Sequence, residues 1–310
     1  MGGQKVIVRR LVYLSALAEE KHFGRAAQKC NVSQPTLSSA IRQLEEELGI
    51  PIVHRGHRFS GFTQEGLRVL EHANRVLSES EKLKEELNLM RDGLAGTLRI
   101  GVVPSVLPIA AWVTSRFGKN HPGVFIEVTS RSAQGILSDL ESFALDLGIS
   151  YLDETRMAKI KELPLYTENL ALLTPIHGPF TGRDSVTWTE TINTPLVLLN
   201  KTMQNRRIID KIYGELGHEV RPQIETNSLM NLAAHVRSGG WSGVVPRECF
   251  AFCSEPPGTR MIKIVEPEIS HVIGLQMAEI EHPSVVTESF FKAAEELDID
   301  SMFFEDCTRV

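Results

Sequence analysis

The sequence predicts an α/β domain that follows an all-helical N-terminal region and one long helix. Three observations predict this order. Apolar residues recur at helical spacing in the first part of the chain, the stretch from Thr63 to Arg91 has no proline, and β-like runs alternate with helical stretches from Thr97 onward. At 310 residues the chain is long enough for two or three domains. We expect their boundaries at residues 1–62, 63–92 and 97–310.

Short helices are expected at the start of the chain, over Val6–Glu20 and Phe23–Cys30. Asn31 then stands where a tight turn between helices needs a residue that tolerates a positive φ. Ser33 is a plausible N-cap of a third helix, and Pro35 lies in its first turn, where a missing N–H costs nothing.

The third helix has one apolar stripe and one polar face, and Gly49 ends it. We expect the stripe to face the core; it consists of Leu37, Ile41, Leu44 and Leu48. Two helices joined by a tight turn, with small polar residues on the second, are typical of a helix-turn-helix. Glutamine reads base edges, serine and threonine bond to bases or phosphates, and arginine neutralises phosphate. An ordinary surface helix is the alternative.

Charge is unevenly distributed along the chain. Residues 1–60 hold nine Lys+Arg and five Asp+Glu, a balance of +4. The remaining residues hold 24 basic and 34 acidic side chains, a balance of −10. A basic N-terminal segment in an otherwise acidic chain indicates that any polyanion binds to residues 1–60.

Two features follow the third helix. Residues 51–62 have a hairpin-like pattern with Gly56 at its tip. The long helix after Thr63 has a narrow apolar edge among many charges, a pattern typical of a helix that pairs with a copy of itself.

The segment "AAQKCNVSQPTLSSAIRQLEEELGIPIVHR", followed by "FTQEG", resembles the N-terminal domain of LysR-type transcriptional regulators. "LRIGVVPS", "LDLGIS" and "GGWSGVVP" come later in the order of that family. The resemblance implies a winged helix-turn-helix, a dimerising linker helix and a two-lobed effector domain similar to periplasmic binding proteins. Lobe I would span about 97–164 and 267–310, and lobe II about 165–266.

When the DNA-contacting positions of the family are carried over to this sequence, one set of residues falls on the recognition helix and another on the wing. On the helix these are Gln34, Pro35, Thr36, Ser38, Ser39 and Arg42, and on the wing Arg55, His57 and Arg58. The sequence departs from the family at Ser39, often Arg or Gly, and at Val53, where an aromatic residue is usual. These departures bear on operator preference and packing.

The second expected site is the cleft between the lobes. Strands that run into helix N-termini collect free N–H groups, which attract anions. The residues expected to bind the effector are Ser105, Arg131, Ser132, Gln204, Asn205, Asn227 and Trp241. Simpler roles remain open: serine and asparagine as N-caps, Arg131 as a solvated surface residue, and Trp241 as filling of a lobe.

The resemblance implies a regulator that binds promoter DNA as a homodimer or homotetramer, contacts RNA polymerase and responds to a small organic anion as co-inducer. No cofactor and no metal are expected, and the lack of a signal-peptide stretch or membrane-length apolar run predicts a cytoplasmic protein. Two rivals remain: a ligand-independent regulator, and an enzyme or transport-type binding protein built on the α/β part.

Four cysteines are scattered, and Cys249 and Cys253 lack a second pair of ligands nearby, which disfavours a zinc site. These two thiols leave a redox-responsive regulator as a further alternative. "GGWSG" lacks the spacing of a nucleophile elbow, and no zinc-protease, P-loop or dinucleotide-binding motif occurs. The sequence gives no support to catalysis.

Overall fold

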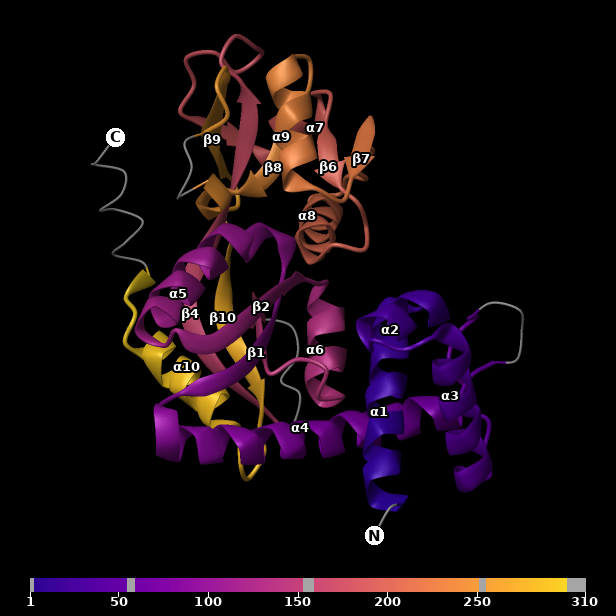
Figure 1. Cartoon of the computed structure of the whole chain (residues 1–310). Coiled ribbons are helices and arrows are strands. Elements are labelled where there is room, and N and C mark those ends of the chain that lie inside the picture. The colour runs from indigo at the N-terminus through magenta and orange to yellow at the C-terminus, as the bar shows by residue number, and fades with distance from the viewer. Residues whose placement is uncertain (1–2, 55–58, 153–158, 251–254, 300–310) are drawn as a thin grey trace. The chain divides into compact units, whose positions relative to one another are not determined.

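The computed structural model describes residues 3–54, 59–152, 159–250 and 255–299 (Figure 1). The chain divides into two compact units. The first contains Met1–Gly96 with Asp139–Leu145, and the second Thr97–Ser138 with Asp146–Val310. In the described ranges, no helix combines the length and the apolar character that a membrane span requires.

In the first unit, α1 (Gly3–Glu20), α2 (Phe23–Lys29) and α3 (Gln34–Leu48) pack around one apolar core. The predicted turn and caps are present: Asn31 has a φ of 53°, and the Ser33 Oγ accepts a hydrogen bond from the Thr36 N–H. Of the predicted stripe, only Leu48 does not face the core. Its side chain is 49% exposed because it stands in the last helical turn, directly before the left-handed Gly49.

The segment after α3 forms the base of the expected hairpin. Val53 and Phe62 form an isolated antiparallel bridge, and the His54 N–H donates to the Gly61 carbonyl. The Glu45 carboxylate accepts from the N–H groups of Ile52 and Val53, so α3 and the hairpin base are tied together. The predicted wing residues Arg55, His57 and Arg58 lie outside the described residues.

Helix α4 (Gln64–Asp92) is the predicted long helix, and the Thr63 Oγ1 caps it through the Gly66 N–H at 2.8 Å. Several large apolar side chains along it are exposed in the single chain: Leu67, Val76, Leu83, Leu87, Leu89 and Met90. Pairing of this edge with a second copy of the chain stays a prediction.

The second unit contains an eight-stranded sheet of order β2-β1-β3-β10-β4-β9-β5, with β8 also paired to β4, and a two-stranded sheet, β6-β7. The strands are β1 (Ala95–Val102), β2 (Gly123–Ser130), β3 (Leu147–Tyr151), β4 (Ile160–Pro175), β5 (Ser185–Thr187), β6 (Val197–Leu199), β7 (Ile224–Thr226), β8 (Gly243–Pro246), β9 (Thr259–Val265) and β10 (Ser270–Ala278). The helices are η1 (Pro104–Val106), α5 (Leu107–Asn120), α6 (Ala133–Glu141), α7 (Trp188–Ile192), α8 (Gln204–Glu215), α9 (Leu229–Ser238), η2 (Arg247–Phe250) and α10 (Val285–Glu295).

The alternation of strands and helices along the chain predicts a parallel sheet, and this prediction is wrong, because the sheet is mixed. The pairs β1–β3, β5–β9 and β6–β7 are parallel, whereas β10 is antiparallel to β3 and β4, and β4 is antiparallel to β8 and β9. The reason is topological: β4 carries the chain out of one lobe and β10 carries it back, so the two strands run in opposite directions. The sequence pattern does not predict β5, α7, β10 or the first half of β4.

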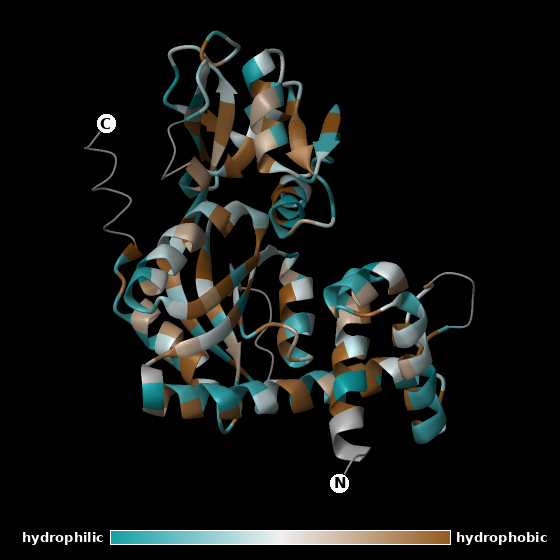
Figure 2. Cartoon of the chain, in the orientation of Figure 1, coloured by the Kyte–Doolittle hydropathy of each residue, from teal (hydrophilic) through white to brown (hydrophobic). Residues whose placement is uncertain are grey.

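Strand β4 belongs to both lobes. Residues 160–169 pair with β10 in lobe I, and residues 170–175 pair with β8 and β9 in lobe II. Figure 1 shows α5 and α10 beside the lobe I strands, and α7 and α9 beside the lobe II strands. The strands are mostly hydrophobic and the outer faces of the helices hydrophilic (Figure 2), so each lobe has its own apolar interior.

Substitution of Gly66 by Ala tests how closely α4 approaches the hairpin base. A Cβ at this position would overlap the Ile52 carbonyl oxygen, which is backbone and cannot move aside as a side chain could. We expect Gly66→Ala to lower the free energy of unfolding of the first unit by about 1–3 kcal/mol, measured by urea unfolding of the full chain. The control is Gly214→Ala in α8, where nothing lies within 4 Å of the added Cβ. Equal stability of the two variants would contradict the close approach.

Candidate DNA-binding surface and effector site

The outward face of α3 is polar and open to solvent. Gln34, Pro35, Thr36, Ser39 and Arg42 are exposed, and Ser38 is half-buried. The Thr36 hydroxyl lies 2.8 Å from the Ser33 Oγ, so the start of the helix is held by its own cap. The predicted DNA-facing residues of this helix therefore form one accessible surface.

Helix α3 is fixed from behind by α1. The Arg10 guanidinium forms a 2.5 Å ion pair with Glu47 and donates to the Gln43 Oε1 at 3.0 Å. Leu37, Ile41 and Leu44 on the same side are buried. An ion pair, a hydrogen bond and apolar contacts therefore hold one side of α3 against α1 and leave its other side exposed.

The predicted effector residue Ser105 is buried in η1, with 4% of its surface exposed. Its Oγ lies 3.4 Å from the hydroxyl of Tyr151, at the end of β3. Asn205, in the first turn of α8, is likewise 4% exposed, and among the described residues neither of its amide atoms has a hydrogen-bond partner. Two predicted effector residues, one from each lobe, are thus buried and polar.

A buried carboxyl, Glu168 on β4, joins this group. The Tyr151 hydroxyl donates to the Glu168 Oε1 at 2.7 Å. Burial, with a smaller contribution from the nearby Glu248 carboxylate, raises the pKa of Glu168 to about 8, although the hydroxyls of Tyr151 and Ser105 act in the opposite direction. The carboxyl of Glu168 is therefore mostly protonated at neutral pH.

The same surroundings act on the neighbouring groups. Burial raises the pKa of Tyr151 well above its usual value, Glu168 adds to the shift, and the polar side chains of Ser105 and Asn205 partly oppose it. Asn205 therefore lies close to the Tyr151 hydroxyl. We call Ser105, Tyr151, Glu168 and Asn205 the buried polar cluster.

A second carboxyl stands beside the cluster. Glu248 in η2 accepts from the Asn169 N–H at 3.0 Å and from the Asn169 Nδ2 at 3.3 Å, and burial raises its pKa. Asn169 is the residue at which β4 passes from its pairing with β10 to its pairing with β8. The two carboxyls therefore flank the crossing between the lobes.

The other predicted effector residues take different positions. Ser132 accepts from the Gly135 N–H at the start of α6, as an N-cap does, and Arg131 is exposed and donates to the Ser130 carbonyl. Asn227 is exposed and Gln204 is buried. Trp241 donates to the Gln223 Oε1 at 3.1 Å and packs against the lobe II core, which agrees with its space-filling role.

Sequence reasoning missed Tyr151, Glu168 and Glu248. The usable signal was Glu168, a single acid in the segment "YTENLALL" that β4 carries into the interior. A lone charged residue within a buried strand is uncommon and normally paired. Tyr151 and Glu248 carry no such signal, because only the fold places them beside Glu168.

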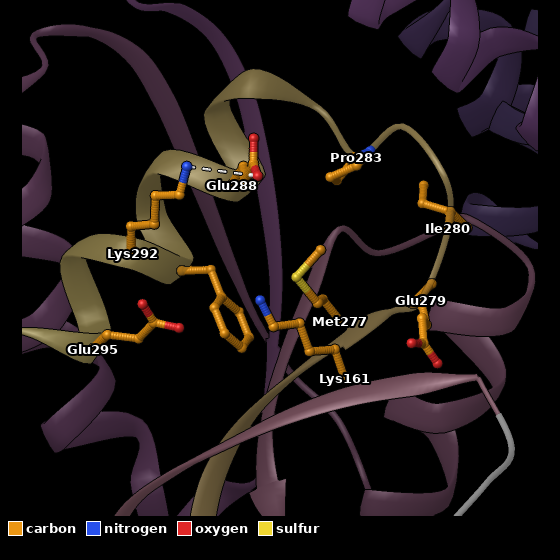
Figure 3. Close-up of a pocket in the computed structure, with 10 residues that line it drawn as sticks. Lys161, Met277, Glu279, Ile280, Pro283, Glu288, Lys292 and Glu295 are labelled. Carbon is orange, nitrogen blue, oxygen red and sulfur yellow. Dashed lines mark ion pairs between the residues drawn. The ribbon is translucent and has the colours of Figure 1, made fainter.

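A separate cavity of about 270 Å³ lies between the end of β10 and α10 (Figure 3). Three of its charged groups have partners: the Lys161 Nζ lies 4.4 Å from the centre of the Phe291 ring, and Lys292 pairs with Glu288 at 3.6 Å. None of the predicted effector residues lines it. Across the described part of the chain, no group of three or more His, Cys, Asp or Glu is placed to hold a metal ion.

The helix-turn-helix unit and the two-lobed α/β unit together define a DNA-binding regulator that carries an effector domain. Residues 8–67 match the sequence profile "Bacterial regulatory helix-turn-helix protein, lysR family", and residues 91–297 match "LysR substrate binding domain". The chain belongs to the LysR family of transcriptional regulators.

Similar proteins include regulators named for peroxide. The chain is 32% identical over 275 residues to the "Hydrogen peroxide-inducible genes activator" of Pectobacterium carotovorum, covering 83% of this chain and 89% of that protein. It is 31% identical over 272 residues to the "DNA-binding transcriptional dual regulator OxyR" of Escherichia coli K12, covering 86% and 88%.

Two solved structures share the fold. One is a full-length OxyR variant from Pseudomonas aeruginosa, with a TM-score of 0.70, 23% identity, and coverage of 93% of this chain and 97% of that chain. The other is CbnR in complex with its target DNA, with a TM-score of 0.66, 20% identity, and coverage of 93% and 98%.

Substitution of Glu168 by Gln tests the protonation of the buried carboxyl. The pKa of Glu168 is raised in the folded chain from 4.5 to about 8, so the folded state loses stability as pH rises through this range. We expect Glu168→Gln to be more stable than wild type above about pH 8, by on the order of a few kcal/mol, with the advantage shrinking toward about pH 5. Urea unfolding across pH measures this.

The control is Glu127→Gln on β2, which makes the same substitution at an exposed position. A constant difference between Glu168→Gln and wild type from pH 5 to about pH 9 would show that Glu168 is ionised throughout.

Proposed function

We propose that the chain controls transcription by inserting α3 into the major groove of an operator, and that a small molecule held between the two lobes changes this activity. The observation that carries the proposal is the exposed polar face of α3 over a buried apolar stripe, in the segment of the chain with a balance of +4. Gln34 would read bases and Arg42 would neutralise a phosphate.

Two copies would bind together. The exposed apolar edge of α4 supplies a pairing surface, and a two-fold dimer places two recognition helices on an interrupted palindrome. The spacing of the half-sites would then follow from the distance between the two α3 helices.

The effector would act through the crossing strands. Both β4 and β10 connect the lobes, and the buried polar cluster draws residues from each lobe. A ligand shifts the arrangement of the lobes only if it binds one arrangement better than the other. The anionic effector predicted from the sequence stays a prediction here. Arg131, the cation expected to assist it, is exposed and donates to its neighbour's carbonyl.

A redox response is the second candidate function, and the peroxide-related names of similar proteins favour it. Cys249 is buried in η2, and Cys253 lies outside the described residues. In this candidate, hydrogen peroxide would oxidise the two thiols to a disulfide and be reduced to two molecules of water.

Substitution of Arg42 by Ala tests the DNA-binding surface. We expect Arg42→Ala to weaken binding to DNA flanking the chain's own gene by roughly tenfold and to lower the salt slope by about 1, since one phosphate contact is lost. Gln34→Ala should cost about 1–3 kcal/mol and relax base preference. Fluorescence anisotropy measures both.

The control for this test is Arg116→Ala, which removes the same charge from an exposed position on α5. Its affinity for DNA should match wild type. If the Arg42 and Gln34 variants also bind as wild type does, α3 is not the recognition helix.

Peroxide treatment tests the redox candidate. Under that candidate, operator affinity changes after oxidation in wild type and not in Cys249→Ser, while Cys30→Ser responds as wild type does. Mass spectrometry of the treated chain should show the loss of two hydrogen atoms from the Cys249 and Cys253 peptides. An unchanged affinity with both thiols still reduced would remove the candidate and leave the small-molecule effector.

A further inference from the structure

Glu168 lies where β4 leaves lobe I. It stands opposite His271 in one of the last pairs between β4 and β10, and Leu170, two residues later, already pairs with Pro246 on β8. Its side chain is 1% exposed. A ligand that reaches Glu168 therefore contacts the strand that joins the two lobes.

The buried polar cluster contains atoms that lack partners. Among the described residues, the Glu168 Oε2 and both amide atoms of Asn205 have no hydrogen bond. Buried polar atoms in folded proteins are normally paired. Tyr151 links these groups, because its hydroxyl donates to the other oxygen of Glu168 and lies close to Asn205. Lobe I and lobe II thus present unsatisfied donors and acceptors at one place.

The charge that acts directly on Glu168 is negative. The pKa of Glu168 responds to the hydroxyls of Tyr151 and Ser105 and to the carboxylate of Glu248, while Arg247 acts on Glu248. Arg206, the buried arginine of α8, is paired with Asp210 and Glu225. A helix N-terminus attracts anions. Beside Ser105, however, the Glu168 carboxyl already occupies that position.

We infer that the effector presents a hydrogen-bond-donating nitrogen group, such as an amidinium, ammonium or amide, to Glu168 and Asn205, and that it is not a carboxylate. The N–H groups would donate to the Glu168 Oε2 and the Asn205 Oδ1, which lack donors. A carboxylate on the ligand would be repelled by the nearby Glu248 carboxylate. This inference rests on the proposed function, since it names the ligand class of the same site.

A cationic ligand changes the protonation of the site. On binding, the Glu168 carboxyl releases its proton to solvent, and the resulting carboxylate pairs with the ligand cation, so charge is balanced. Binding is then linked to pH. The titratable groups beside Glu168 are Tyr151, Tyr166, Glu248 and His271, from its own strand and the elements around it. Arg247 acts on Glu248, and Cys249 acts on Tyr166.

The test compares three ligands of one shape on the full chain: benzamidinium, benzamide and benzoate. Isothermal titration calorimetry should show that benzamidinium binds most tightly and benzoate most weakly. With a pKa of about 8 for Glu168, benzamidinium should bind about tenfold more tightly at about pH 9 than at about pH 7. Glu168→Gln should abolish this pH dependence, because its side chain has no proton to release.

Further variants test whether ligand binding and its pH dependence arise from the buried polar cluster or from residues near it. His271→Gln should keep the tenfold rise with pH, and Glu127→Gln on β2 should bind all three ligands as wild type does. Asn205→Ala should weaken benzamidinium and benzamide alike, because it removes the acceptor that both use. A rise with pH that persists in Glu168→Gln would overturn the assignment of Glu168.

Two outcomes distinguish the inference from the proposed function. Tightest binding of benzoate, lost in Asn205→Ala, would overturn the inference and support effector binding at this site. No binding of any of the three ligands up to about 10 mM would overturn both the inference and the effector part of the proposed function. DNA binding through α3 would be untouched by either result.

Discussion

The crossing of the chain between two lobes is the constraint on which the effector domain depends. Because β4 carries the chain outward and β10 returns it, both must lie at the centre of the sheet and run in opposite directions. Glu168, at the crossing, is therefore buried although it is polar. The Tyr151 hydroxyl donates to one of its carboxyl oxygens, and the next residue, the exposed Asn169, donates to Glu248. A polar group thus lies in the interior where the chain passes from one lobe to the other.

The crossing therefore connects the two lobes and also carries a buried ionisable group, the carboxyl of Glu168. A carboxyl that burial holds protonated can donate or accept, and the arrival of a counter-charge favours its ionised form. The unsatisfied amide of Asn205, in the first turn of α8, faces the same place from lobe II. A ligand that satisfies both residues would favour one arrangement of the lobes, and the free energy for that shift would come from hydrogen bonds and charge pairing made there.

In the helix-turn-helix unit, the two faces of α3 have separate roles. One helix has an apolar stripe that packs on α1 and a polar face that nothing in the unit covers. The caps at Ser33 and Gly49 set its two ends, and the Arg10 and Glu45 contacts hold it against α1 and the hairpin base. Its outward residues are then free to contact a groove, because the fold makes no other use of them.

Local information in the sequence determined the helices, their caps and the family. Asn31, Ser33, Pro35 and Gly49 act through their own backbone preferences and neighbours, so the turn and α3 could be predicted from them. The buried stripe followed from periodicity, except at Leu48, where the helix ends. The sequence also placed Ser105 and Asn205 at helix starts. It could not give the direction of β10, or bring Tyr151 and Glu248 to Glu168, because 17 and 80 residues separate them from it along the chain. Only the tertiary structure decided those contacts, since they depend on how strands distant in sequence pair at the crossing.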